Sequence, residues 1–155
     1  MEVNFYRLTS HNIDNFLPKL LEKIYISGIR ILVFCKDIDQ MNHLNDKLWT
    51  YTTKFFLPHG TMHDNFLEKQ PILLTTDLRF TNNSPNLLIL LNKIEIDNIS
   101  DLGIFDKISY IFEDQNNEEK QNARFMWKFF SNNFDKKQLR YWEYVDNQWE
   151  NKFFD

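Results

Sequence analysis

The chain has 155 residues with a formal net charge of −4, 43% hydrophobic residues, one cysteine and three glycines. This length and apolar content predict one folded domain over residues 1–155 rather than a disordered chain. One cysteine excludes a disulfide framework, and so few glycines exclude a glycine-rich phosphate loop. The acidic balance argues against a protein that coats nucleic acid through its bulk charge.

The N-terminus and the longest apolar run bear on where in the cell the protein is found. Glu2 stands where a signal peptide would carry lysines, and no apolar segment of signal-peptide length follows it. The longest apolar run, residues 87–91, is far shorter than the roughly 18–20 residues of a membrane span. We therefore expect a soluble, cytoplasmic protein.

Strand-like and helix-like segments alternate along the chain. Apolar and aromatic runs predict strands at residues 3–8, 29–35, 72–76, 87–91, 107–112 and 139–145, the last of them as an edge strand. Apolar residues at helical spacing predict helices at 13–27 and 118–132, and one between a cap at Asp37 and Trp49. This alternation predicts an α/β fold of three layers, with a mostly parallel central sheet and helices on both faces. The topology is expected to be Rossmann-like, without a nucleotide-binding loop.

Few residues suggest catalysis. Cys35 lies at the C-terminal end of the second predicted strand, where open α/β sheets bind ligands, and His59 would be its base. A lone cysteine is more often a small buried apolar residue. His59 and His63 have the spacing of a zinc pair, but Pro58 and Gly60 favour a loop there and no third ligand is evident. We therefore expect no catalytic residue, no metal and no cofactor.

The last predicted helix carries a cationic stripe, formed by Lys120, Arg124 and Lys128 at intervals of four residues. Residues at this spacing share one helix face. Trp127 borders that face, and Phe112 ends the strand that leads into the helix. Cations around an aromatic pocket suit a peptide that is both acidic and hydrophobic. The alternative is an ordinary solvated helix face with Trp127 turned into the core.

Several segments, in the same order, resemble the chi subunit of bacterial DNA polymerase III. They are Asn-Phe-Tyr-Arg-Leu at 4–8, Ile-Leu-Val-Phe-Cys at 31–35, Leu-Trp-Thr-Tyr at 48–51, Phe-Phe-Leu-Pro-His-Gly at 55–60, Gln-Pro-Ile-Leu-Leu-Thr at 70–75, Ala-Arg-Phe-Met-Trp-Lys at 123–128, Leu-Arg-Tyr-Trp-Glu at 139–143 and Gln-Trp-Glu at 148–150. The resemblance implies a non-catalytic accessory subunit of the clamp loader. It also implies two partners, the psi subunit and the acidic C-terminal tail of single-stranded DNA-binding protein, which ends in phenylalanine.

The resemblance assigns the tail site to the cationic stripe. Arg124 is expected to hold the terminal carboxylate of the tail, and Lys120 and Lys128 its aspartates. Trp127 and Phe112 are expected to hold the phenylalanine ring.

The same resemblance assigns the psi interface to Trp49, Phe55, Phe56, Leu57 and Pro58. Large apolar groups on a turn are hard to bury within one small domain, so an exposed cluster that marks a partner site is expected here. The alternative is that Trp49 and Phe56 belong to the core.

Two further functions stay open as alternatives. Residues 31–34, 44–48, 58–60 and 73–77 resemble, in order, the second motor domain of helicases. However, Leu-Arg-Phe-Thr follows Asp77 where that motor has an Arg-Gly pair, and no arginine-finger motif is present. The other alternative is direct binding of single-stranded DNA through Trp127, Trp142 and Trp149. The net charge of −4 and the lack of a long basic groove count against it.

Overall fold

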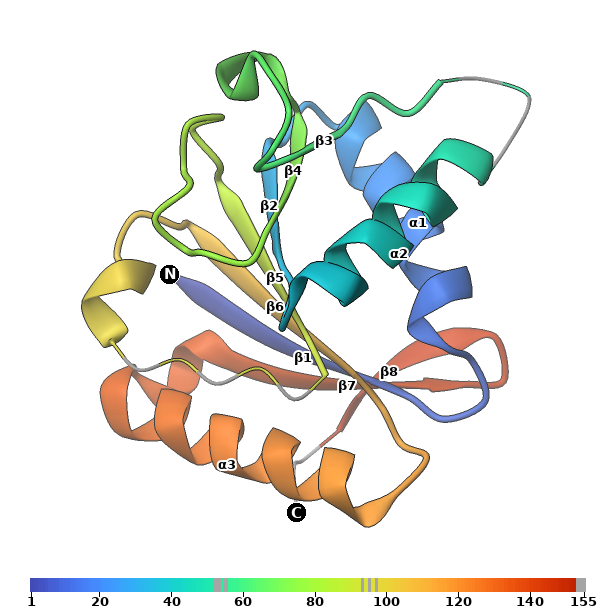
Figure 1. Cartoon of the computed structure of the whole chain (residues 1–155). Coiled ribbons are helices and arrows are strands. Elements are labelled where there is room, and N and C mark those ends of the chain that lie inside the picture. The colour runs from blue at the N-terminus through green and yellow to red at the C-terminus, as the bar shows by residue number, and fades with distance from the viewer. Residues whose placement is uncertain (52–53, 55, 93, 95, 97, 153–155) are drawn as a thin grey trace.

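The structure is a computed structural model that describes residues 1–51, 54, 56–92, 94, 96 and 98–152. The described part of the chain forms one sheet of eight strands in the order β3-β4-β2-β5-β6-β1-β7-β8 (Figure 1). The strands are β1 (Glu2–Leu8), β2 (Ile31–Phe34), β3 (Gly60–Thr61), β4 (Ile72–Thr75), β5 (Leu87–Leu91), β6 (Lys107–Glu113), β7 (Leu139–Val145) and β8 (Gln148–Lys152). Neighbouring strands pair in parallel except β7 and β8, which are antiparallel. The predicted α/β class with a mostly parallel sheet is therefore confirmed.

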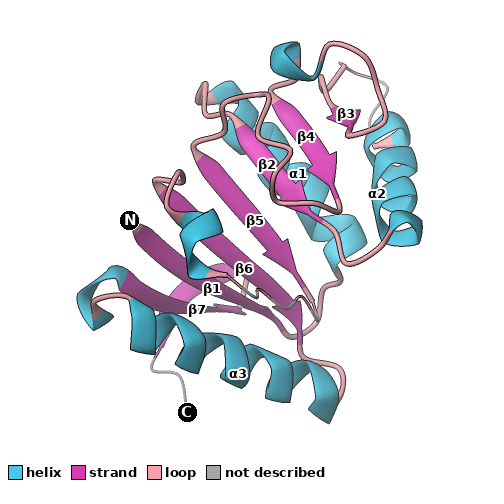
Figure 2. Ribbon diagram, turned by 60° about the vertical axis from the view of Figure 1, so that its left-hand side comes forward, coloured by secondary structure: helices cyan, strands magenta, loops and turns pink. Residues whose placement is uncertain are grey.

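The described residues form three α-helices between strands, and these helices lie on opposite faces of the sheet. The helices α1 (Ile13–Ile26) and α2 (Ile38–Thr50) lie on one face, and α3 (Asn117–Asn133) lies on the other (Figure 2). The short 3-10 helices in the described part of the chain are η1 (Leu67–Lys69), η2 (Ile99–Leu102) and η3 (Lys136–Gln138). Each α-helix begins after a polar cap, Asn12, Asp37 or Asn116, whose side chain accepts a hydrogen bond from a backbone N–H of the first turn. No helix in these described ranges is long and apolar enough to span a bilayer.

Two consecutive residues of β1 show how the core is divided. Phe5 points toward α3, where its ring lies 5.0 Å from that of Trp127. Tyr6 points to the other face, because side chains alternate along a strand. There its ring lies 5.1 Å from Trp149 of β8, which in turn lies 5.4 Å from Phe16 of α1. Both faces of β1 are thus covered by aromatic packing.

The prediction that residues 139–145 form an edge strand is wrong. β7 lies between β1 and β8 and pairs in parallel with β1. The chain turns back after Val145 through Asp146 and Asn147, both with positive φ (49° and 62°), and adds β8 as the outer strand. Asp and Asn tolerate this left-handed backbone, so a two-residue hairpin turn forms at little cost.

Candidate protein-binding surfaces

The cationic stripe of α3 surrounds a tryptophan that is only partly buried. Trp127 packs against Phe5, and the centroid of its ring lies 6.4 Å from that of Tyr141 in β7. Arg124 and Lys128 are exposed, and neither makes an ion pair with any other described residue. The structure therefore brings two available cations beside an aromatic ring, as the spacing predicts.

Lys120, the third cation of the stripe, has a partner. Its Nζ lies 3.1 Å from Oδ1 of Asp114, in the loop between β6 and α3. That oxygen has no aligned hydrogen bond, so the contact is held mainly by the attraction of opposite charges. The charge of Lys120 is thus partly neutralised before any ligand arrives.

Asp114 also belongs to a polar network at the carboxyl end of β1. Arg7 donates from Nε to Asp114 at 2.7 Å and from Nη1 to Glu143 at 3.1 Å, and also to the hydroxyl oxygen of Tyr141 at 3.3 Å. Burial outweighs the nearby charge of Arg7 and raises the pKa of Tyr141 to about 12. This network joins β1, β7 and the start of α3, and it fixes the strands beneath Trp127.

Phe112 lies in the core below the stripe rather than on its surface. Its side chain is 2% exposed, and its ring lies 6.0 Å from that of Tyr110 on the same face of β6. The hydroxyl of Tyr110 donates to Oδ1 of Asn122 in α3, which places both rings under the helix. Phe112 can support a ligand site from within, but its ring does not line the outer surface.

The second predicted surface is an exposed aromatic pair. Trp49 lies in the last turn of α2 and Phe56 in the loop that follows, with exposed fractions of 56% and 58%. Their rings lie 5.2 Å apart with an interplanar angle of 37°, and the ring of His59 lies 5.0 Å from Trp49 on a neighbouring side. Two large aromatic groups in contact on a surface are typical of a protein-binding site. They are not core residues.

The other residues of this surface differ in exposure. Leu57 is buried in the core and Pro58 is half-buried, while Phe55 lies outside the described residues. His59 is buried, and its Nδ1 donates to the carbonyl oxygen of Leu57 at 2.8 Å. Sequence reasoning considered His59 only as a base or a metal ligand and missed its contact with Trp49. The tripeptide Pro58-His59-Gly60, a rigid turn that follows an aromatic run, is the signal that could have indicated this role.

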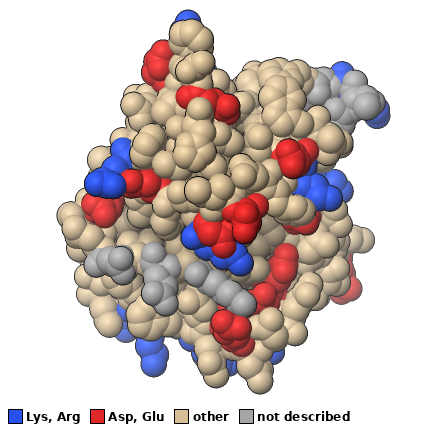
Figure 3. Space-filling view, viewed as in Figure 1, with Lys and Arg blue, Asp and Glu red and all other residues tan. Residues whose placement is uncertain are grey.

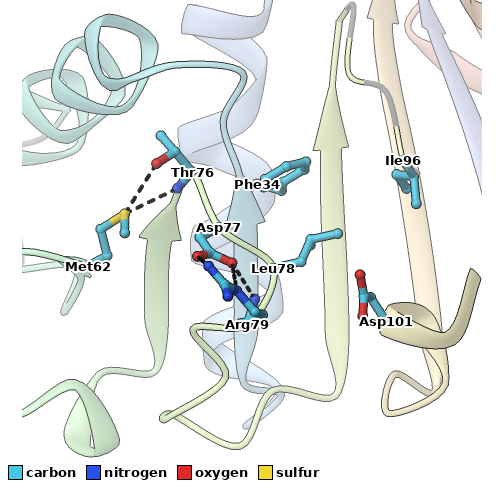
Figure 4. Close-up of a pocket in the computed structure, with 8 residues that line it drawn as sticks. All are labelled: Phe34, Met62, Thr76, Asp77, Leu78, Arg79, Ile96 and Asp101. Atoms are coloured by element: carbon cyan, nitrogen blue, oxygen red, sulfur yellow. Dashed lines mark hydrogen bonds and ion pairs between the residues drawn. The ribbon is translucent and has the colours of Figure 1, made fainter. Parts of the chain in front are cut away.

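A hollow of about 420 Å³ opens near the carboxyl ends of β2 and β4 (Figure 4). Ligands of open α/β sheets bind at such ends. Here the exposed guanidinium of Arg79 is held by Asp77, with Nη2 to Oδ2 at 2.6 Å, and Asp101 also lines the hollow. The nearby N-terminus of α2 is capped by the carboxylate of Asp37. A phosphate entering this region would meet carboxylates that repel it.

The residues considered for catalysis or metal binding differ in exposure. Cys35 is fully buried, and burial raises the pKa of its thiol to about 12, so it is protonated at neutral pH. His59 is buried, whereas His63 is exposed. Among the described residues, no group of three His, Cys, Asp or Glu side chains could hold a metal ion.

These features define an α/β protein whose distinctive residues lie on a helix face and a loop rather than at the carboxyl ends of its strands. The chain belongs to the family described as DNA polymerase III chi subunit, HolC, whose model matches residues 1–134. It is similar to a protein of Rickettsia prowazekii (strain Madrid E) named probable DNA polymerase III subunit chi. The two are 34% identical over 89 residues, which cover 57% of this chain and 54% of that relative. The match thus spans about half the length of the relative, and the predicted resemblance to the chi family is confirmed.

Proposed function

We propose that this chain is a non-catalytic accessory subunit of the replicative clamp loader that couples it to single-stranded DNA-binding protein in the cytoplasm. The observation that carries the proposal is the presence of two exposed cations, Arg124 and Lys128, which make no ion pair with another described residue and lie beside the half-buried Trp127 on α3 of a chi-family chain. Such a site suits the acidic, phenylalanine-ended tail of that protein, because charge and ring recognition act together.

The structure supports different roles for the individual tail-site residues. Arg124 can bind the terminal carboxylate with two parallel hydrogen bonds, a geometry that lysine lacks. Trp127 offers the exposed part of its ring to the phenylalanine, and Phe112 contributes from the core, where its ring lies beside Tyr110. Lys128 binds an aspartate, and Lys120 contributes less because Asp114 already holds it.

The psi subunit is proposed to bind the pair Trp49 and Phe56, with Pro58 at its margin. Leu57 contributes by anchoring the loop in the core, and Phe55 remains part of the proposed interface from the sequence resemblance. An exposed aromatic pair of this kind fits the centre of a protein interface, where aromatic residues carry most of the binding energy.

The remaining expectations fit this proposal. We infer a single domain over residues 1–155 with a three-layer, Rossmann-like arrangement, since helices lie on both faces of one sheet. Direct binding of single-stranded DNA by a tryptophan platform fits less well. Trp127 lies on the α3 face, whereas Trp142 donates to Asn4 and Trp149 packs on Tyr6, both on the opposite face.

The test is a titration of the Arg124→Ala variant with a fluorescently labelled acidic peptide ending in Asp-Ile-Pro-Phe. We expect binding weaker by about 1.5–3 kcal/mol, the range for a hydrogen bond to a charged group. Lys19→Ala removes an exposed charge from α1 on the other face and is the matched control, with affinity expected to stay unchanged. If the Arg124→Ala variant and the wild type bound the peptide with equal affinity, α3 would not be the binding site of the tail.

A further inference from the structure

Positive charge is concentrated in one part of this acidic chain. Residues 120–140 contain six basic side chains, Lys120, Arg124, Lys128, Lys136, Lys137 and Arg140, and one acidic side chain, Asp135. In Figure 3, Lys and Arg atoms appear along the lower border of the molecule, where α3 lies, while acidic and basic atoms are mixed over the rest of this face. The surface around α3 is therefore an exception to the overall charge of −4.

The two ends of α3 differ in charge. Asp114 precedes the helix, and Glu118 and Glu119 lie in its first turn. These carboxylates occupy the end where the helix dipole would otherwise attract an anion. Beyond the other end, Lys136 and Lys137 of η3 are both exposed, and neither makes an ion pair with another described residue. We call these two lysines the basic extension.

The basic extension lies on the same flank of α3 as the tryptophan. Trp127 faces Tyr141 of β7, and η3 is the segment that joins the end of α3 to the start of β7. In chain order, Lys136 and Lys137 thus follow the cationic line of Arg124 and Lys128 beyond the C-terminal end of α3, in the segment that leads to β7. Arg140 is not part of this line, because it points to the other face of β7, where its charge helps to lower the pKa of Glu2.

We propose that an acidic peptide held at Trp127 by its C-terminal residue lies along α3 in one direction, with its preceding residues running toward η3. There the basic extension binds carboxylates upstream of the peptide's end. The opposite direction would bring those carboxylates past Lys120, which Asp114 already holds, to Asp114 and the exposed Glu118, which repel them. The inference rests on the proposed function. It adds the direction in which the bound tail lies along α3 and the need for negative charge upstream of the tail's C-terminal residue.

The experiment compares two labelled peptides of equal length, Asp-Asp-Asp-Asp-Asp-Ile-Pro-Phe and Ser-Ser-Ser-Ser-Asp-Ile-Pro-Phe, by anisotropy titration. The double variant Lys136→Glu/Lys137→Glu should bind the acidic-led peptide about fivefold more weakly, in keeping with two exposed charge contacts. Its affinity for the serine-led peptide should stay close to that of the wild type. The matched control Lys19→Glu/Lys23→Glu makes the same charge change on α1 and should bind both peptides as the wild type does.

Several outcomes would overturn the inference. Equal affinities of the double variant and the wild type for the acidic-led peptide would show that the basic extension does not touch the tail. An equal loss for both peptides, or the same loss in the control, would indicate a general charge effect. Loss of binding to an oligothymidine strand with unchanged peptide affinity would assign the two lysines to nucleic acid. Failure of the proposed function is distinct, because the wild type would then bind neither peptide.

Discussion

Nζ of Lys120 lies 3.1 Å from Oδ1 of Asp114, and the same carboxylate receives a hydrogen bond from Nε of Arg7 at 2.7 Å. Asp114 thus connects the cationic stripe of α3 to the strand below it. A lysine that must leave or share a carboxylate gains less from a new anionic ligand than a lysine without a partner. The three cations of the stripe are therefore unequal, although their spacing in the sequence is identical.

This inequality predicts how two alanine variants rank. Lys120→Ala should weaken binding of the tail peptide by no more than about 1 kcal/mol, as for an exposed charge pair. Arg124→Ala should cost clearly more, because its guanidinium has no competing partner among the described residues. Peptide titration of both variants under one buffer condition measures the difference. A loss for Lys120→Ala as large as that for Arg124→Ala would contradict this ranking.

Salt should weaken the proposed tail binding. The stripe cations are at the surface, where added ions screen charges over about 8–10 Å near physiological ionic strength. Affinity for the acidic peptide should fall steadily as sodium chloride is raised, while affinity for the serine-led peptide should fall less. A flat response for the acidic peptide would mean that apolar contacts with Trp127 account for binding alone.

The aromatic pair and its neighbour Leu57 should respond differently to truncation. Phe56→Ala removes an exposed ring, so the free energy of unfolding should change by no more than about 0.5 kcal/mol while association with psi is reduced. Leu57→Ala opens a cavity in the core and should destabilise the fold by about 2–5 kcal/mol. Urea unfolding and a psi-association assay separate the two effects. Similar destabilisation by both variants would show that Phe56 is a structural residue.

Cys35 gives a prediction about pH. Burial raises the pKa of its thiol from an ordinary 9.0 to about 12. Between these two values the unfolded chain loses a proton that the native state keeps, so the unfolded state is favoured as pH rises. The contribution of Cys35 is complete below pH 9.0 and is lost through about pH 12.

The same burial should protect the thiol from reagents. At neutral pH, labelling of native Cys35 by an aromatic disulfide should be far slower than labelling in denaturant, because only the exposed thiolate reacts. Replacement by serine should remove all labelling. Rapid reaction of the native protein would show that the strand end at Cys35 is open to solvent.

The elements found from sequence are those whose apolar pattern is dense. Residues 31–34 and 87–91 are continuous apolar runs, as expected for strands covered on both faces, and both are central strands. The sequence pattern did not predict β8. Residues 148–152 are polar except for Trp149, so they lack the alternating apolar residues typical of a strand. The preceding Asp146-Asn147 is a recognisable hairpin signal, and it would have placed β7 inside the sheet.

The candidate surfaces were predictable only in part. Four-residue spacing was sufficient to bring Lys120, Arg124 and Lys128 to one side of α3, since local helix geometry decides that. The contacts of Asp114 with Arg7 depend on two segments 107 residues apart in sequence. No local pattern encodes such a pair, and so the partner of Lys120 became visible only in the folded chain.

The most direct test of the central claim is a titration of the wild-type protein with the acidic peptide, with and without its terminal phenylalanine. We predict micromolar binding of the complete peptide, or about −8 kcal/mol, and loss of nearly all of it without the phenylalanine, since Trp127 then has no ring to bind. Equal binding of both peptides would reduce the site to a nonspecific cationic surface. Binding of neither by a demonstrably folded protein would contradict the proposed coupling to single-stranded DNA-binding protein.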